Sequence, residues 1–355
     1  MASTRGIRCM MMRGGTSKGA YFLAEDLPAD EAERDALLLA IMGSPDPRQI
    51  DGIGGADPLT SKVAIVSRSA DDATDVDYLF LQVMVDKAIV TDRQNCGNIL
   101  AGVGPFAVER GLVPATGDST SVRIKMLNSD SIATATFPTP DGMPEYSGST
   151  AIDGVPGTAA AIRIEFVDTA GSSTGALLPT GNVTDVVDGV TVTCVDNGMP
   201  SVLIAAASLG LTGHESPDEL QDDVQLNERL AAIRLAAAEL MGMGDVSKTT
   251  VPKMVLLSPA TEGGAVSTRS FLPVKVHTSI GVLGALTVAA GVSLPGAVGN
   301  DFAVIPPAGE QFSIEHPTGS FDIVIEMDGT DVISSGNIRT ARKLFDGTVF
   351  PRSLT

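Results

Sequence analysis

The sequence has no tryptophan and only three residues each of tyrosine, cysteine and histidine among 355. The cysteines, Cys9, Cys96 and Cys194, cannot form an even set of disulfides, and their spacing fits no metal site. The histidines lie far apart along the chain, so a histidine-based metal centre is not expected either. These scarcities predict a reduced protein without a bound metal.

Basic residues are also scarce, with 24 Lys and Arg against 43 Asp and Glu and a net charge of −19. Such a chain repels phosphate backbones and anionic lipid, so neither nucleic acid nor a membrane is expected as a partner. The longest apolar run, 280–294, contains glycines and is too short to span a bilayer, and residues 1–12 lack a signal-peptide core. We therefore expect a cytoplasmic protein that binds anions through local basic groups and helix ends.

Hydrophobic residues are plentiful at 43%, which is enough to build a folded core. A chain of 355 residues is longer than one core usually serves, so two domains are expected. The segment 138–156 is dense in Pro, Gly, Ser and Thr, which favours a domain crossover there.

Residues 94–98 lie between a strand-like run, 78–85, and a helix-like run, 99–110. Cys96 should therefore stand just before a helix N-terminus, where unpaired N–H groups favour a thiolate or a bound carboxylate. A buried cysteine without chemistry is the alternative. Against it stand flanking residues that fill cores poorly and suit close approach of the backbone to a ligand: Asn95, Gly97 and Asn98.

Lys62 follows a glycine-rich loop, 51–61, and opens the apolar strand 63–66. A lysine at a strand edge is usually a solvated charge. Partial desolvation by the apolar strand would instead favour the neutral amine, which can act as a general base. Both interpretations stay open at this point.

A glycine-rich stretch, 13–19, resembles a phosphate-binding loop only superficially. The Walker spacing is absent and a strand rather than a helix follows, so nucleotide binding is rejected. The turn could hold a carboxylate through the hydroxyls of Thr16 and Ser17, or it could simply connect two strands.

Several other segments carry clear local signals. A helix is predicted from the Asp30 cap to a stop at Gly43, and strands 120–126 and 132–137 form a hairpin. Ser216 begins a capping box, followed by an apolar stripe that predicts one long helix to Leu240.

Residues 277–281 resemble the stretch around Cys96, since small polar residues precede a helix rich in Gly, Ala and Val. Residues 278–284 can be aligned with 96–102, which favours a weak internal duplication over chance similarity. Each helix start would then form an anion cradle. The turn 196–200, which contains Met199, also places polar groups at strand ends, where ligand contacts are common.

Seven segments together carry a resemblance to a known family: 12–19, 43–52, 60–64, 95–98, 196–200, 268–271 and 277–281. They resemble the PrpF-like branch of the diaminopimelate epimerase-like proteins, and within it the 4-oxalomesaconate isomerases and tautomerases. The resemblance implies an α/β (α+β) fold of two pseudo-symmetric domains, each with a mixed sheet wrapped around a central helix and the active site in the interdomain cleft. The domains would span 1–140 and 141–335, with 336–355 returning to the first.

The resemblance also implies roles for individual residues. The family's lysine base matches Lys62, which precedes Cys96 by 96 − 62 = 34 residues, and Cys96 would be the opposing acid or orient the intermediate. The second cysteine of the epimerases falls near Thr278, so racemisation by two thiols is not expected. The resemblance implies no cofactor. The remaining candidates would bind substrate: Thr16, Ser17, Asn95, Gly97, Asn98, Met199, Arg269, Thr278, Ser279 and Gly281.

The expected reaction is a 1,3-allylic proton transfer that shifts the C=C bond of 4-oxalomesaconate, a tricarboxylate, in bacterial degradation of aromatic acids. Keto–enol tautomerisation of the same compound and isomerisation of 2-methylaconitate are alternatives within the enzymes. A non-catalytic polycarboxylate-binding protein is the alternative outside them, although such a protein needs neither Lys62 nor Cys96. Relatives imply a homodimer, for which the sequence offers no test.

Overall fold

The computed structural model describes residues 6–92, 96–166, 169–247, 249–272 and 275–352. The chain divides into two compact units, one formed by Met1–Glu165 and Ile338–Thr355 and the other by Phe166–Asn337. The boundary at residue 165 is later than the crossover expected within 138–156. Residues after 140 stay in unit 1 because strand β8 (Ala161–Phe166) pairs with the returning strand β17 (Asp331–Val349).

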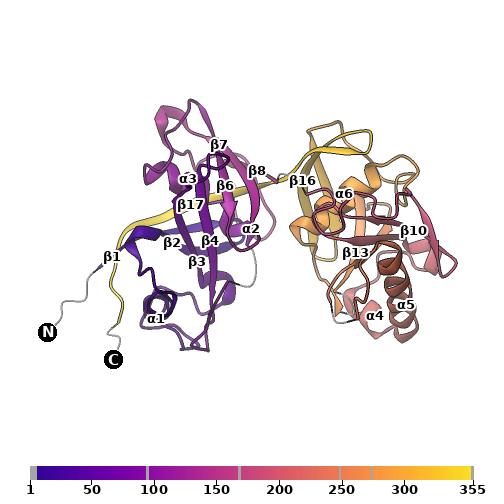
Figure 1. Ribbon diagram of the computed structural model, residues 1–355, viewed down its shortest axis with the longest axis horizontal. Helices are drawn as coiled ribbons and strands as arrows, with labels where there is room; N and C mark the ends of the chain where they lie inside the picture. Colours follow the sequence, from indigo (N-terminus) through magenta and orange to yellow (C-terminus); the bar gives the residue numbers. More distant parts are fainter. Residues whose placement is uncertain (1–5, 93–95, 167–168, 248, 273–274, 353–355) are drawn as a thin grey trace. The chain divides into compact units, whose positions relative to one another are not determined.

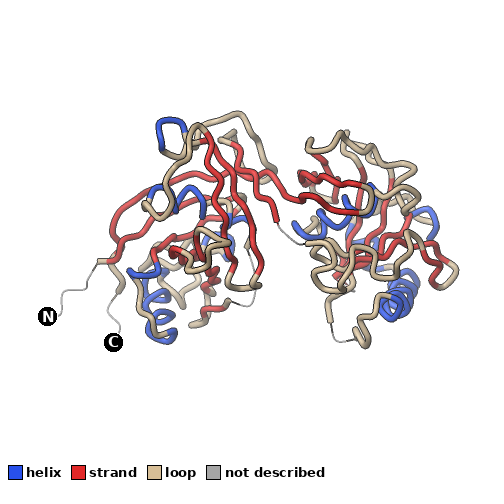
Figure 2. The backbone as a smooth tube through the Cα atoms, turned by 45° about the horizontal axis from the view of Figure 1, so that its top comes forward, coloured by secondary structure: helices blue, strands red, loops and turns tan. Residues whose placement is uncertain are grey.

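Unit 1 is built mainly of strands, and Figure 2 shows how few helices accompany them. Strand β3 (Lys62–Arg68) runs parallel to β2 (Ser17–Leu23) and antiparallel to β4 (Val76–Val83). The other elements are β1 (Ile7–Gly14), β5 (Val90–Thr91), β6 (Ser119–Met126), β7 (Ser131–Pro138), α1 (Glu31–Met42), α2 (Gly97–Leu100) and α3 (Val103–Glu109).

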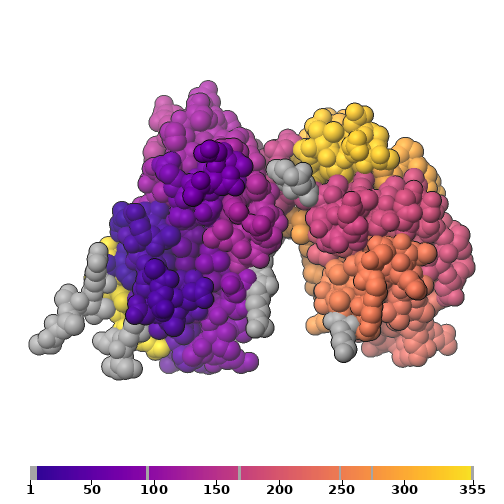
Figure 3. Space-filling view, viewed as in Figure 1, coloured from indigo at the N-terminus to yellow at the C-terminus, as the bar shows by residue number. Residues whose placement is uncertain are grey.

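The C-terminal segment completes unit 1. β17 pairs antiparallel with β1 from Ile7 opposite Val349 to Gly14 opposite Ala341. In the space-filling view, yellow C-terminal residues lie beside indigo N-terminal residues at the lower left (Figure 3). The edge of β1 is therefore covered by residues more than three hundred positions away, which protects it from pairing with other chains.

Unit 2 contains the longest helix and a second central helix, α6, which lies among the strands in Figure 1. Strand β12 (Lys253–Ser258) runs parallel to β11 (Ser201–Ala205) and antiparallel to β13 (Val266–Leu272). The other elements are β9 (Asp185–Val187), β10 (Val190–Val195), β14 (Lys275–Val276), β15 (Gln311–His316), β16 (Gly319–Asp328), α4 (Pro217–Asp222), α5 (Val224–Leu240) and α6 (Val282–Ser293).

The two units repeat one order of elements and pairings. In unit 1 the strands run β1, β2, β3, β4, β5, β6 and β7, with α1 after β2 and α2–α3 after β5. In unit 2 they run β10 to β16, with α4–α5 after β11 and α6 after β14. Corresponding strand pairs also run in the same relative direction in the two units: β4 and β6 are parallel, and so are β13 and β15. The units are therefore pseudo-symmetric, as the sequence suggested.

Two expected helices are each divided in the structure. The run 99–110 forms α2 and α3, because Pro105 has no N–H to donate to the carbonyl of Ala101 and the chain tightens at Gly102. The run after Ser216 forms α4 and α5, because Asp223 leaves the helical conformation and caps α5 by accepting from the N–H of Leu226.

Other local predictions are confirmed. Asp30 accepts a hydrogen bond from the N–H of Glu33 at the start of α1, and Gly43 ends that helix with a φ of +82°. The hairpin of β6 and β7 and the capping box at Ser216 also form. Each of these signals depends on a few neighbouring residues, which explains why it could be read directly from the sequence.

Candidate active site

Lys62, Ser17 and Cys96 meet in unit 1. The Lys62 Nζ lies 3.0 Å from the Ser17 Oγ and 3.4 Å from the Cys96 Sγ. All three residues are buried, with 7%, 2% and 9% of their surfaces exposed. The amine also lies 5.9 Å from the centre of the Phe80 ring, a cation–π distance. An amine and a thiol in hydrogen-bond contact, largely shielded from water, can exchange a proton directly.

Strand order explains why Lys62 faces Cys96. Val63 and Ile65 belong to the same hydrophobic cluster as residues of α1, so the alternate positions of β3, Lys62 among them, face the helix pair α2–α3 on the other side of the sheet. Lys62 stands opposite Gly19 on β2, and a Cβ at Gly19 would lie 2.7 Å from the Lys62 carbonyl oxygen. The glycine therefore permits the close approach of the two strands at the site.

The loop before Lys62 is held by Gln49, a residue whose role the sequence did not reveal. Its amide is 1% exposed, donates to the Ser44 Oγ, and accepts from the Ala56 N–H and the Ser61 Oγ at 2.8 and 2.7 Å. Ser61 directly precedes Lys62, so Gln49 fixes the entry of the chain into β3. The only sequence signal was a glutamine inside a long glycine-rich segment.

The hairpin turn at Gly15 and Thr16 packs on the start of α2. Gly15 has a φ of +50°, and a Cβ at Gly14 would approach the Asn98 carbonyl oxygen to 2.4 Å. The Asn98 amide donates to the Thr16 hydroxyl at 3.0 Å. The structure thus brings together four of the predicted residues, Thr16, Ser17, Gly97 and Asn98, around Lys62 and Cys96. Asn95 lies outside the described residues.

Cys96 is the N-cap of α2, as expected, and two tyrosines hydrogen-bond to backbone carbonyls at the start of this helix. Tyr78 donates to the Cys96 carbonyl and Tyr21 donates to that of Ile99. Burial, followed by the nearby Cys96 sulfur, raises the pKa of both tyrosines well above the usual value. Both hydroxyls therefore keep their protons and remain donors that fix the position of the thiol.

The other two cysteines are buried structural residues. Burial raises the pKa of Cys9 and of Cys194 to about 12. Each therefore stays a neutral thiol packed in a hydrophobic cluster.

The remaining predicted residues belong to unit 2, and three of them surround the start of α6. Gly281 is the N-cap of this helix, and apart from its chain neighbours and its own helix no described residue comes within 4 Å of a Cβ built there. The Ser279 N–H donates to the His277 Nδ1, and the Thr278 carbonyl accepts from Thr318. The cap is three residues later than the alignment of Thr278 with Cys96 implied. Met199 lies in the turn before β11, where its carbonyl accepts from Ser201.

Arg269 is placed apart from this group. It stands opposite Leu256, which belongs to the hydrophobic cluster on the α4–α5 side of the sheet. The next residue, Ser270, stands opposite Val255, which belongs to the cluster around α6 on the other side. Its guanidinium donates to the carbonyls of Glu215 and Thr268. Burial lowers the pKa of Arg269, while Glu215 and Glu315 act in the opposite direction. Arg269 is thus on the face of β13 away from α6.

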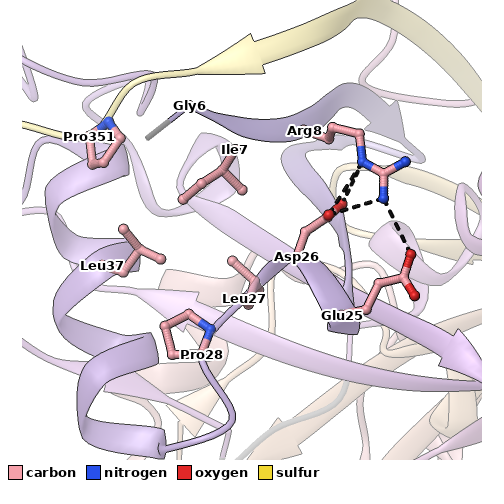
Figure 4. A pocket seen from close by; sticks show the side chains of 9 residues that line it. All are labelled: Gly6, Ile7, Arg8, Glu25, Asp26, Leu27, Pro28, Leu37 and Pro351. Atoms are coloured by element: carbon pink, nitrogen blue, oxygen red, sulfur yellow. Dashed lines mark hydrogen bonds and ion pairs between the residues drawn. The ribbon is translucent and has the colours of Figure 1, made fainter. Parts of the chain in front are cut away.

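Two cavities lie elsewhere in unit 1. One of about 760 Å³ is lined by Ile7, Leu27, Leu37 and an ion-paired edge in which Arg8 contacts Glu25 and Asp26 (Figure 4). Its charges already pair with one another, and the lining that the structure describes includes none of the predicted site residues.

The second cavity, of about 400 Å³, is lined by Arg13, Arg342 and the loop 146–159. The Arg13 guanidinium donates to the carbonyls of Gly15 and Thr340, so it also braces the hairpin turn. Burial, and after it the neighbouring Arg342, lower the pKa of Arg13.

The part of the chain that the structure describes contains no cluster of three or more His, Cys, Asp or Glu residues arranged to hold a metal ion. Within the same residues, every helix is too short or too polar to cross a membrane.

These observations define a class: an α/β protein of two pseudo-symmetric units, with an amine–thiol pair between the first residue of a strand and the cap of a central helix. The chain belongs to the PrpF protein family, whose model matches residues 4–352.

Two curated relatives are similar over nearly their whole length. The chain is 61% identical over 344 residues to the (4E)-oxalomesaconate Delta-isomerase of Novosphingobium sp. (strain KA1), covering 96% of each chain. It is 57% identical over 350 residues to the 4-oxalomesaconate tautomerase of Pseudomonas putida (strain KT2440), covering 98% of this chain and 97% of the relative.

A solved structure confirms the fold. The crystal structure of methylitaconate-delta-isomerase superposes with a TM-score of 0.90 at 35% identity, covering 98% of this chain and 96% of that one. The predicted α/β (α+β) architecture of two pseudo-symmetric units is therefore correct for each unit and for the order of elements.

Proposed function

We propose that the chain is a cofactor-independent isomerase that shifts the C=C bond of 4-oxalomesaconate by 1,3-allylic proton transfer. The observation that carries this proposal is the buried contact of 3.4 Å between the Lys62 Nζ and the Cys96 Sγ. The similarity to the Novosphingobium relative supports the choice of substrate. The reaction would serve a bacterial pathway that degrades aromatic acids.

In the proposed step, the neutral Lys62 amine removes a proton from the allylic carbon. The electron pair delocalises over the C=C and C=O bonds as a dienolate, and the Cys96 thiol returns a proton to the carbon two positions away. The products on the protein are an ammonium and a thiolate. Since the two atoms are in hydrogen-bond contact, one proton transfer from Lys62 to Cys96 restores the starting state.

The contact also predicts the stereochemistry of the reaction. Two groups 3.4 Å apart approach the planar dienolate from the same side, so both proton transfers should occur on one face. Ser17 would hold the amine in place, and N–H groups at the start of α2 would stabilise the added charge. The predicted substrate contacts in unit 2 remain part of this proposal.

A second candidate is keto–enol tautomerisation of the same compound, which the similarity to the Pseudomonas relative favours. Both reactions need one base, one acid and stabilisation of an enolate. They differ in whether the C=C bond changes position.

Proton NMR in deuterated water with 4-oxalomesaconate separates these candidates. The wild type should move the C=C bond and incorporate deuterium at the newly protonated carbon. Lys62→Ala and Cys96→Ala should each reduce kcat by at least about a thousandfold, as expected for a lost acid or base that contacts the reacting atoms. Cys9→Ala is the matched control and should retain activity.

The alternative outcomes are also informative. Conversion of enol to ketone with the C=C bond in place would establish the tautomerase. Full activity of Lys62→Ala would refute the amine as the base in either reaction. If 4-oxalomesaconate is unchanged by the wild type, the substrate proposal fails and 2-methylaconitate should be tested next.

A further inference from the structure

The repeated topology places a second lysine, Lys253, at the position of Lys62. Lys62 is the first residue of β3, which runs parallel to β2 and antiparallel to β4. Lys253 is the first residue of β12, which runs parallel to β11 and antiparallel to β13. β3 and β12 are corresponding strands of the two units, so the two lysines begin the same strand of the repeated fold.

The two lysines also share a face. Val255 and Leu257 of β12 belong to the hydrophobic cluster around α6, while Met254 and Leu256 pack in the cluster on the other side of the sheet. Because strand residues alternate, Lys253 projects on the side of the central helix, as Lys62 does in unit 1. The sequence alone did not single out Lys253, because its strand lacks the glycine-rich loop that precedes Lys62.

The surroundings of Lys253 are basic and polar. Burial, and after it the positive charge of Lys253, lower the pKa of His277. Burial and the neighbouring Arg234 lower the pKa of Lys253 itself. Among the described residues the Lys253 amine has no hydrogen bond or ion pair, although the chain carries an excess of acidic residues.

His277 connects the lysine to the start of α6. Its Nδ1 accepts the N–H of Ser279, so in the neutral ring the proton is on Nε2, which is a donor. Two residues later, Gly281 caps the 12-residue helix, whose first N–H groups have no partner within the helix. Ser270, on the same face of β13 as the residues that contact α6, has a buried hydroxyl without a partner among the described residues.

We propose that Lys253 and His277, together with the first turn of α6, bind a carboxylate of a small polycarboxylate in unit 2. Lys253 is then the counterpart of Lys62 with a different task. Unit 1 places a thiol beside its lysine, whereas the unit 2 cysteine, Cys194, packs in the cluster on the opposite face of the sheet. Without a thiol partner the second lysine supplies positive charge rather than a proton-transfer pair. Only the identity of the polycarboxylate rests on the proposed function.

The test is isothermal titration calorimetry with tricarballylate, a saturated tricarboxylate that has no C=C bond to move. Lys253→Met removes the charge and keeps the length of the side chain, and it should weaken binding at least about tenfold, as for a lost charge-assisted contact. Lys253→Arg should bind within about threefold of the wild type. Arg229→Met, an exposed residue of α5, is the charge-matched control and should bind as the wild type does.

If the wild type fails to bind tricarballylate, or if Lys253→Met binds as Arg229→Met does, the proposal is overturned. If tricarballylate binds through Lys253 but 4-oxalomesaconate is not converted, the proposed function fails and this site stands.

Discussion

At the scale of single residues, Ser17 is the group that orients the Lys62 amine. It accepts a hydrogen bond of 3.0 Å from Nζ and is 2% exposed. Ser17→Ala should lower kcat about tenfold or more, since the Lys62 amine becomes an ammonium as it takes the proton and a hydrogen bond to a charged group contributes about 1.5–3 kcal/mol. Steady-state kinetics with 4-oxalomesaconate measure this effect.

The control for this prediction is Ser121→Ala, an exposed serine on β6 of the same unit. It should leave kcat unchanged. A Ser17→Ala variant that is as active as Ser121→Ala would show that the amine is positioned by other contacts.

Outside the site, Gln49 should contribute strongly to stability. Gln49→Leu would leave the Ala56 N–H and the hydroxyls of Ser44 and Ser61 without their buried partner. Each unsatisfied group costs about 1–3 kcal/mol, so the free energy of unfolding should fall by at least about 2 kcal/mol. Urea denaturation measures it, and kcat should fall as well because Ser61 precedes Lys62.

Arg48→Ala at the neighbouring exposed position is the matched control. We expect its free energy of unfolding to change by less than about 0.5 kcal/mol. Equal stabilities of Gln49→Leu and Arg48→Ala would mean that the loop repacks around the lost amide.

At the scale of elements, the pairing of β1 with β17 contains an unfavourable contact. Arg13 and Arg342 stand directly opposite each other, and like charges in such positions are destabilising. Arg342→Gln should therefore raise the free energy of unfolding by about 0.2–1 kcal/mol. Urea denaturation in buffer without phosphate measures this change, and salt should diminish it by screening.

Arg68→Gln, an exposed arginine at the end of β3, is the control and should not stabilise the protein. A loss of stability in Arg342→Gln would show that this arginine makes a contribution larger than its repulsion from Arg13.

Elements with local signals were predicted well, and those that depend on distant contacts were not. The Asp30 cap and the Ser216 capping box act within a few residues. The division of the helix after Cys96 needed Pro105 together with packing against Tyr21, whose hydroxyl occupies the space where a Cβ of Gly102 would be. Arg269 stays a predicted substrate contact, and only the register of β13 shows that its side chain is on the face away from α6.

At the scale of the whole molecule, an ion pair joins the C-terminal segment to the rest of unit 1. Arg110, at the end of α3, donates to both carboxylate oxygens of Asp346, at 2.8 and 2.6 Å. This hydrogen bonding to Arg110 lowers the pKa of Asp346 in the folded protein. The pair therefore stabilises the fold above the unfolded pKa of about 4, and this contribution is lost as the pH falls through the lower folded value.

Asp346→Asn should consequently reduce stability at neutral pH and weaken the loss of stability on acidification. Thermal unfolding from pH 7 down to pH 3 measures both effects. Asp118→Asn, an exposed carboxylate before β6, should keep the wild-type pH dependence. An unchanged pH profile for Asp346→Asn would mean that the ion pair contributes nothing measurable, as for many surface pairs.

The sequence alone determined the family and the duplicated plan and named Lys62 and Cys96 as candidates, because these depend on residue types in short motifs and on repeated element order. The contact between the Lys62 Nζ and the Cys96 Sγ was decided by the tertiary structure. Only the tertiary structure decided which distant residues meet and which face a side chain is on. It placed Gln49 against Ser61 before Lys62, Arg269 on the face of β13 away from α6, and Lys253 at the position in unit 2 that corresponds to Lys62. Strand register carries that information. A shift of one residue moves a side chain to the opposite side of a sheet, and register is set by contacts between segments far apart in the chain.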